Sequence, residues 1–375
     1  MEDVATRAVD LLTELVGIDS VNPGLVPRAA GEGPIVEHLR GRLEHSGFAT
    51  TVVPAAGHTD RPSLVGVPAV PGDGPTVVLN GHLDTVGVAG MPEPFSVRVD
   101  GDRLLGRGAA DMKGGVAALV AAAEELARSG APVRPVLALV ADEEDASLGS
   151  EAVLAALPAL GIRPDACLIA EPTDLALSRS LRGFGVVRVR FPGRAAHSSQ
   201  AELGVNAVTH LGRLLHAVDR RAAAVRAGGG DLMVTLAEGG RSAFVVPDHA
   251  ECLVELRTTP RQRSADALDE VRALLEPDWQ AEAELVTHRD GWQLDRSGPA
   301  AALAARLGAE LGTGPTFDAP YWMEAPLWQQ ACPTLVCGPS GGGLHAADEW
   351  VSLGQVRRFA CGLVDALASW SPDAD

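Results

Sequence analysis

The sequence predicts an α/β domain with a mixed central sheet flanked by helices, interrupted by a smaller α+β domain. Apolar runs rich in β-branched residues or leucine alternate with helical patterns in the first and last parts of the chain, as in α/β folds. The middle part follows the order β-α-β-β-α-β of the ferredoxin-like split motif. A chain of 375 residues is also longer than a usual single domain. We therefore predict one discontinuous domain, 1–180 with 290–375, and an inserted domain, 181–289.

Helical spacing and short apolar runs define the individual elements. In the larger domain, helices are predicted over residues 4–16, 33–45, 112–128, 149–157, 300–311 and 351–367. Strands are predicted there over 50–53, 63–67, 76–79, 136–140, 166–169 and 334–337, with a hairpin-like stretch near 95–105. In the inserted domain, strands over 185–191, 231–236, 250–258 and 281–286 accompany helices over 205–226 and 265–275.

The composition is that of an ordinary soluble protein. Hydrophobic residues make up 46% of the chain and charged residues 21%, without a sign of disorder. The formal net charge of −18 and the scattered basic residues argue against a nucleic-acid partner. The five cysteines lack CxxC spacing, so neither a disulfide framework nor a thiolate zinc site is indicated. Because neither a signal-peptide pattern nor a membrane-spanning apolar stretch is found, we expect a cytoplasmic protein without a membrane partner.

His82 and Asp84 follow a predicted buried strand in the stretch VVLNGHLDTV. Alternate residues of an extended chain point to the same side, so the imidazole can bind a metal while the carboxylate holds its second nitrogen in the donor tautomer. Taken alone, the pattern also fits a surface turn.

Asp111 stands in GRGAADMKGG, directly before a predicted helix. A carboxylate at this position can cap the helix. It can also bridge two cations, which the neighbouring glycines would allow to approach the backbone closely. The motif alone leaves both interpretations open.

Acidic residues and a histidine follow other apolar strands. ADEEDASLG places Glu143 and Glu144 at the carboxyl end of a strand, where open α/β sheets form their sites. Adjacent side chains point in different directions, so one can ligate a metal while the other takes a proton from water. Glu171 in LIAEPTD and His345 in GPSGGGLHAADEW also follow strands. With His82 and Asp111, these residues form a two-metal set suited to zinc, cobalt or manganese.

The motifs HxD, RGxxDMKGG, EE, AEPT and HSS, followed by a late glycine-rich loop with a histidine, occur in this order from His82 to His345. This order resembles the two-zinc amidohydrolases that include acetylornithine deacetylase, succinyl-diaminopimelate desuccinylase, aminoacylase and glutamate carboxypeptidase. The resemblance implies a zinc-peptidase-like catalytic domain and an inserted lid domain through which the chain forms a homodimer. It also implies hydrolysis of a linear amide bond.

The resemblance assigns five residues to metal ions. Asp111 would bridge two divalent ions, with His82 and Glu171 completing one site and Glu144 and His345 completing the other. The ions would be Zn²⁺, with Co²⁺ or Mn²⁺ as alternatives.

Further residues would act on water and substrate. Glu143 would be the general base, next to the ligand set that Asp84 helps to orient. His197 in RAAHSSQAELGVNA matches the histidine that a dimer partner lends to the site, where it would stabilise the oxyanion. Arg257 in VELRTTP matches the arginine that binds a substrate carboxylate. Without the resemblance, His197 would be read as a loop histidine and Arg257 as part of a surface ion pair.

Two features of the pattern bear on the substrate. Phe244 occupies the position of a frequent family asparagine, and Glu324 stands in an EAP stretch like that of the acetylornithine deacetylase branch. The EAP stretch leads us to expect that the enzyme removes the acyl group from an N-acyl amino acid, whereas Phe244, which lacks the side-chain donor of that asparagine, is the best support for a silent protein. A dipeptidase or carboxypeptidase with the same chemistry stays open, as does a catalytically silent dimer that binds amino-acid derivatives.

Overall fold

The computed structural model describes residues 2–70, 74–88 and 90–372, which form two compact units. The first unit takes in Met1–Arg179, Leu294–Phe317 and Met323–Asp375, and the second takes in Ser180–Gln293 and Asp318–Trp322. The short segment Asp318–Trp322 thus groups with the second unit although it follows residues of the first. The role of the second unit as a lid and dimerisation domain stays a prediction.

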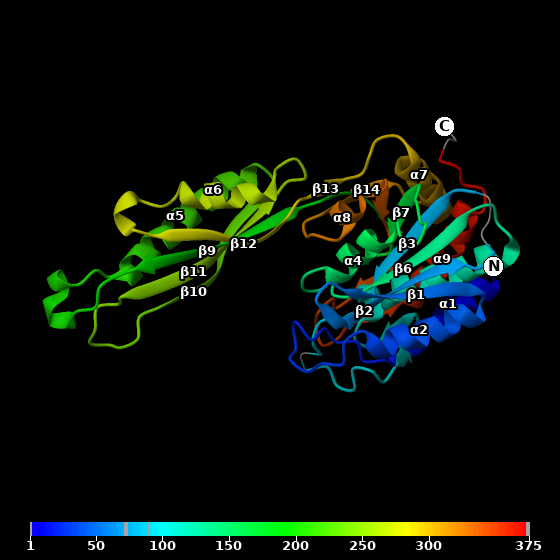
Figure 1. The fold of residues 1–375 in the computed structure, drawn as a ribbon, viewed down its shortest axis with the longest axis horizontal. Helices are drawn as coiled ribbons and strands as arrows, with labels where there is room; N and C mark the ends of the chain where they lie inside the picture. The colour runs from blue at the N-terminus through cyan, green and yellow to red at the C-terminus, as the bar shows by residue number, and fades with distance from the viewer. Residues whose placement is uncertain (1, 71–73, 89, 373–375) are drawn as a thin grey trace. The chain divides into compact units, whose positions relative to one another are not determined.

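A mixed six-stranded sheet with the order β1-β2-β6-β3-β7-β15 is the centre of the first unit (Figure 1). Its strands are β1 (Phe48–Ala55), β2 (His58–Pro68), β3 (Thr76–His82), β6 (Arg134–Val140), β7 (Ala166–Ile169) and β15 (Thr334–Val336). β3, β6, β7 and β15 run parallel, whereas β2 is antiparallel to both of its neighbours. All seven residues of β3 are buried, as expected for a strand covered on both faces.

Helices cover this sheet, and most of them share one apolar core with it. They are α1 (Glu2–Val16), α2 (Gly33–His45), α3 (Gly114–Ser129), α4 (Leu148–Ala156), α7 (Pro299–Leu311), α8 (Ala325–Trp328) and α9 (Leu353–Leu367). α3 is rich in alanine and buried on most sides, and it packs against α1 and α9. A smaller sheet with the order β16-β17-β5-β4 consists of Gly341–Gly342, Trp350–Ser352, Arg103–Leu105 and Arg98–Asp100.

Two helices of the first unit begin later than the sequence predicts. α9 starts at Leu353 because residues Trp350–Ser352 pair with β5 and the Ser352 hydroxyl accepts the N–H of Gln355 at 3.1 Å as an N-cap. α3 starts at Gly114 because Ala109–Lys113 forms a wider turn, in which Asp111 has non-helical backbone angles. Both differences lie within a few residues of a site motif, where local contacts override helix propensity.

The second unit contains a four-stranded antiparallel sheet with the order β10-β11-β9-β12. Its elements are β9 (Gly183–Pro192), α5 (Ala207–Ala227), β10 (Asp231–Gly239), β11 (His249–Thr258), α6 (Ala267–Arg272) and β12 (Glu282–Arg289). Buried and less buried residues alternate along β9 and β11, because the helices cover one face of the sheet. This is the ferredoxin-like arrangement that the sequence predicts.

A three-stranded sheet of β13 (Trp292–Gln293), β8 (Leu177–Leu181) and β14 (Pro315–Ala319) was not predicted. Its strands are short and lie where the chain passes from one unit to the other. Among the described residues, no helix is long and apolar enough to cross a membrane.

Candidate metal centre

The predicted site residues of the first unit meet at the carboxyl edge of its central sheet. His82 is the last residue of β3 and pairs with Val140, the last residue of β6. Glu143 and Glu144 lie in the turn after β6, and Glu171 follows β7, which pairs in parallel with the other side of β3. Parallel strands end at the same edge, so side chains that are far apart in sequence converge there.

Asp111 lies between the two histidines. Its Oδ1 atom is 3.1 Å from Nε2 of His82, and its Oδ2 atom is 3.3 Å from Nε2 of His345. The same His345 nitrogen is 3.2 Å from Oε2 of Glu144. A carboxylate whose two oxygens face two different imidazoles has the disposition of a bridging ligand.

Two overlapping groups in this cluster could each hold a cation. One comprises His82, Glu143 and Glu171, and the other comprises His82, Asp111 and Glu144. In each group, one ligand atom from every residue lies within 4.8 Å of the others. The first group contains Glu143, which the family resemblance assigns to the water and not to the metal.

Burial and crowding shift the acid–base properties of these side chains. Burial, reinforced by the charge of Glu171, raises the pKa of Glu143 well above its ordinary value. Burial also raises the pKa of Glu171 strongly and that of Glu144. Hydrogen bonds to Asp111 and Glu144 raise the pKa of His345 to about 10. A raised pKa means that the ionised form of Glu143, Glu144 or Glu171 is unfavourable unless a positive charge lies nearby. The two histidines supply only part of that positive charge.

The donor set fits divalent cations. Oε1 of Glu144 is buried and has no hydrogen-bond partner among the described residues, although burying a lone carboxylate oxygen is costly. Carboxylate oxygens combined with one imidazole on each side are ligands for zinc, cobalt or manganese. The local chemistry is therefore that of a metal centre.

Asp84 holds the turn that carries the two glutamates. Its carboxylate accepts the N–H of Glu143 at 3.1 Å and the N–H of Glu144 at 3.2 Å. Nδ1 of His82 lies 3.0 Å from the backbone oxygen of Asp84 and 3.6 Å from Oδ1. The backbone oxygen of Asp84 is therefore the nearer partner of the His82 ring. The carboxylate of Asp84 instead fixes the backbone of Glu143 and Glu144.

Arg107 and Glu349 support Asp111, and sequence reasoning missed both. Glu349 is 1% exposed and accepts the N–H groups of Gly108 at 3.1 Å, Ala110 at 3.0 Å and Asp111 at 3.2 Å. Nη1 of Arg107 donates to Glu349 at 2.6 Å. In the sequence, the only signal for this pair is that Arg107 stands between two glycines. Its partner Glu349 is 242 positions away, so no local pattern connects them.

Glu324, the residue of the EAP stretch, is buried at the N-terminus of α8. Its Oε2 atom accepts the hydroxyl of Ser150 at 2.7 Å, and Ser150 in turn accepts the indole N–H of Trp328 at 3.0 Å. Burial raises the pKa of Glu324 to about 7. This carboxylate is thus anchored to α4 and α8.

His197 and Arg257 belong to the second unit. His197 is exposed, and its Nδ1 accepts the N–H of Ser199 at 3.2 Å, which leaves Nε2 as the donor of the neutral ring. Arg257 forms an ion pair with Glu255, and its guanidinium lies 5.4 Å from the centre of the Phe184 ring. Neither residue belongs to the two candidate cation groups.

Phe184 and Trp322 pack against each other within the second unit. Their rings meet edge to face with centroids 6.1 Å apart, and the Trp322 indole donates to the backbone oxygen of Asp290 at 3.1 Å. Phe244, the departure from the family pattern, is 72% exposed.

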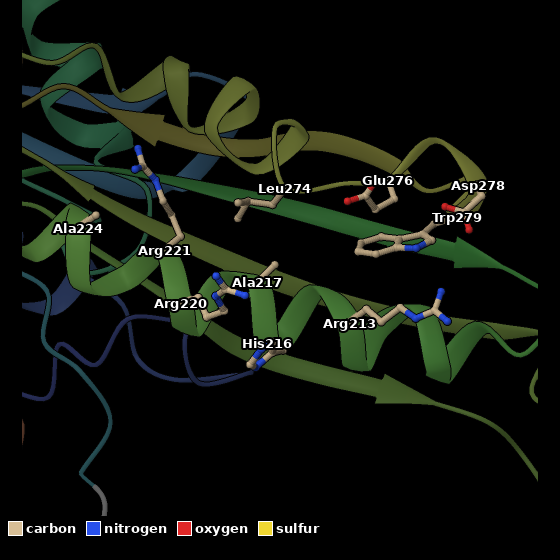
Figure 2. A pocket seen from close by; sticks show the side chains of 10 residues that line it. All are labelled: Arg213, His216, Ala217, Arg220, Arg221, Ala224, Leu274, Glu276, Asp278 and Trp279. Carbon is tan, nitrogen blue, oxygen red and sulfur yellow. The ribbon is translucent and has the colours of Figure 1, made fainter.

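A hollow of about 770 Å³ lies on the helical side of the second unit (Figure 2). α5 contributes Arg213, Arg220 and Arg221, and the segment after α6 contributes Glu276 and Asp278. All five side chains are exposed. The hollow is lined by the second unit alone and contains none of the predicted site residues.

Comparison with known proteins identifies the family. Residues 78–368 match the model of peptidase family M20/M25/M40. The chain belongs to this family. It is 32% identical to N-acetyl-L-citrulline deacetylase from Xanthomonas campestris pv. campestris, with 96% of this chain and 97% of the relative covered. It is 30% identical to acetylornithine deacetylase from Pasteurella multocida, with 85% and 86% covered.

Solved structures of the M20 family share the fold. The Bacillus subtilis YXEP protein, described as a dinuclear metal binding peptidase from the M20 family, superimposes with a TM-score of 0.72 at 18% identity, covering 98% of this chain and 99% of that one. The predicted family, the fold and the activity of a hydrolase on amide bonds are thereby confirmed.

Proposed function

We propose that this M20 hydrolase removes the acyl group from an N-acyl amino acid. The observation that carries the proposal is Asp111, whose two carboxylate oxygens face His82 and His345 in a cluster where two candidate cation groups share His82. Two relatives that align with most of this chain are named as deacetylases of N-acetylated amino acids. An acetyl or similarly small acyl group is therefore the first choice.

We call His82, Asp111, Glu143, Glu144, Glu171 and His345 the strand-end cluster. Five of these residues would hold two divalent ions, for which Zn²⁺ is our first choice and Co²⁺ or Mn²⁺ the alternatives. Asp111 would serve both ions, His82 and Glu171 one, and Glu144 and His345 the other. When bound, such ions polarise a carbonyl and lower the pKa of a water molecule.

Glu143 would carry the proton. Its carboxylate would take a proton from the attacking water as the new C–O bond forms, and deliver it to the nitrogen as the C–N bond breaks. Asp84 supports this role by holding the N–H of Glu143 at 3.1 Å, which keeps the glutamate at the end of β6. One carboxylate would thus act as base and then as acid.

The second unit would supply the substrate contacts. Arg257 would bind the α-carboxylate of the amino acid, a task suited to a planar guanidinium. His197 would donate from Nε2 to the oxyanion, in the site of a partner copy within a homodimer. We place this dimer in the cytoplasm, in keeping with the sequence-based expectation.

A dipeptidase or carboxypeptidase would use the same groups and differ only in what lies on the acyl side. The M20 peptidase from Bacillus subtilis supports this second candidate. A silent dimer is less well supported, because the residues of the centre retain side chains that can ligate metals and transfer protons.

The test is turnover of the purified, zinc-loaded protein on N-acetyl, N-succinyl and N-formyl amino acids and on dipeptides. We expect release of free amino acid from one N-acyl class, abolished by a chelator and restored by added Zn²⁺. Preference for dipeptides would establish the second candidate. Two tightly bound zinc ions per chain without any turnover would favour the silent dimer.

A further inference from the structure

We propose that a buried ion pair, Arg61 with Glu32, positions the turn that carries Glu143 and Glu144. Arg61 lies in β2 and is 5% exposed, and Glu32 directly precedes α2 and is fully buried. The guanidinium donates from Nε to Oε2 of Glu32 at 2.9 Å and from Nη2 to Oε1 at 2.5 Å. The inference rests on the proposed function, because it takes Glu143 as the base and Glu144 as a ligand.

The ion pair reaches the residue directly before Glu143. Nη1 of Arg61 lies 2.8 Å from Oδ1 of Asp142, and the N–H of Asp142 donates to Oε1 of Glu32 at 3.2 Å. Arg61 therefore holds the side chain of Asp142 while Glu32 holds its backbone.

Asp142 needs such support because of its backbone conformation. Its φ of 68° lies in the left-handed region, which residues other than glycine rarely adopt. This conformation turns the chain at the end of β6 and so sets the directions in which Glu143 and Glu144 leave the strand. A backbone of this kind persists where surrounding contacts fix it, and the ion pair supplies two of them.

A second path links the pair to the glutamates through Asn22. The Asn22 side chain donates from Nδ2 to Asp142 at 3.1 Å and to Asp84 at 2.7 Å. Asp84 accepts the N–H groups of Glu143 and Glu144. Removal of Arg61 would leave Glu32 and Asp142 as buried carboxylates without their cation, next to a third carboxylate in Asp84. Repulsion among them would displace the turn.

The first unit offers a matched control. Arg42 in α2 donates from Nε and Nη2 to Glu124 in α3 at 2.8 and 2.9 Å. The side chains are 22% and 9% exposed, so this pair is also largely buried. Among the described residues, its only further hydrogen-bonding side chain is Ser46, which is not part of the site. Arg42→Met thus removes a similar ion pair without touching the turn.

The experiment compares Arg61→Met and Arg42→Met in the full chain by two measurements. Zinc affinity is measured without substrate, by competition with a chromophoric chelator, and kcat and KM are measured on the zinc-loaded protein. We expect Arg61→Met to raise the dissociation constant of at least one zinc ion by about tenfold or more and to lower kcat by about tenfold or more. KM should stay within about threefold of the wild-type value. Arg42→Met should lower Tm but leave zinc affinity and kcat within about twofold of the wild type.

Equal zinc affinity and kcat in the two variants would overturn the positioning role. If Arg61→Met does not fold, Glu32→Gln replaces it, and unchanged zinc affinity and kcat in that variant would overturn the role in the same way. If the wild type binds zinc but cleaves no amide, a selective loss of zinc affinity in the Arg61 variant would keep the role and reject the proposed function. If the wild type turns over substrate and the Arg61 variant matches it, the function stands and the role fails.

Discussion

Charged side chains gather in two regions of this protein, and burial distinguishes them. In the first unit, the carboxylates of Glu143, Glu144 and Glu171 lie at the ends of buried strands with His82. In the second unit, arginines and acids line a hollow of about 770 Å³ between α5 and the segment after α6, all of them exposed to solvent (Figure 2). The strand-end region contains the groups that can bind a cation, whereas the hollow is a space lined by solvated charges.

We infer from this difference that the cost of burial is a better guide to the site than the size of a hollow. Exposed charges remain solvated and contribute little free energy to their surroundings. Buried carboxylates that crowd together are unfavourable unless a cation compensates them. The buried carboxylates of the strand-end cluster therefore need a compensating positive charge, which metal ions would provide. The solvated side chains of the α5 hollow need none.

The largest expected effect comes from Glu143. We expect Glu143→Gln to lower kcat by roughly a hundredfold to ten-thousandfold, because it removes the proton carrier but retains the size of the side chain. The zinc content, measured by atomic emission after gel filtration, should stay near that of the wild type if Glu143 serves the water and not the metal.

Asp145→Asn is the matched control for this substitution, because it removes one negative charge from an exposed residue of the same acidic run. It should leave kcat within about twofold of the wild type, as expected for a surface change. A Glu143→Gln variant with kcat close to that of Asp145→Asn would remove the base from the proposed mechanism. Loss of zinc from Glu143→Gln would instead move this residue into the ligand group with His82 and Glu171.

A smaller effect is expected from Arg257, which extends the comparison to a partly buried arginine of the second unit. Loss of a charged hydrogen bond to a substrate carboxylate costs about 1.5–3 kcal/mol, so Arg257→Gln should raise KM roughly tenfold to a hundredfold. Arg188→Gln is the control, since Arg188 also lies on the sheet and pairs with Glu284 at 3.0 Å. Steady-state kinetics on the preferred substrate measures both, and equal KM values would contradict the role of Arg257.

Much of the strand-end cluster was predictable because its residues follow apolar strands. His82 ends β3, and Glu144 and Glu171 follow the ends of β6 and β7 within a few residues; parallel strands bring their ends together. The ferredoxin-like order of the second unit was predictable for a similar reason, since alternation along β9 and β11 follows from one covered face. Local patterns were sufficient in both cases.

The supporting contacts were not predictable from local patterns. Glu349 reaches the turn before Asp111 from 238 positions away, and Arg61 meets Glu32 and Asp142 only after β2 joins the central sheet. The left-handed conformation of Asp142 has no signal in the sequence, because a run of acids after a strand is usually a solvated turn. Strands β8 and β14 were missed because they are short and pair outside the central sheet. Such features depend on tertiary structure, which overrides local propensity.

The smallest effect is expected from substitutions in the hollow beside α5. They test most directly whether buried rather than exposed charges mark the site. The double substitution Arg213→Ala with Arg220→Ala removes two exposed guanidinium groups from the rim shown in Figure 2. If burial marks the site, kcat, KM and zinc content should stay within about twofold of the wild type, and the free energy of unfolding should change by about 0.5 kcal/mol or less per residue. Turnover on the preferred substrate and denaturant unfolding measure these quantities. A tenfold loss of kcat/KM would make the hollow part of the working enzyme and show that exposed charge in the second unit contributes to function as well as buried charge in the first.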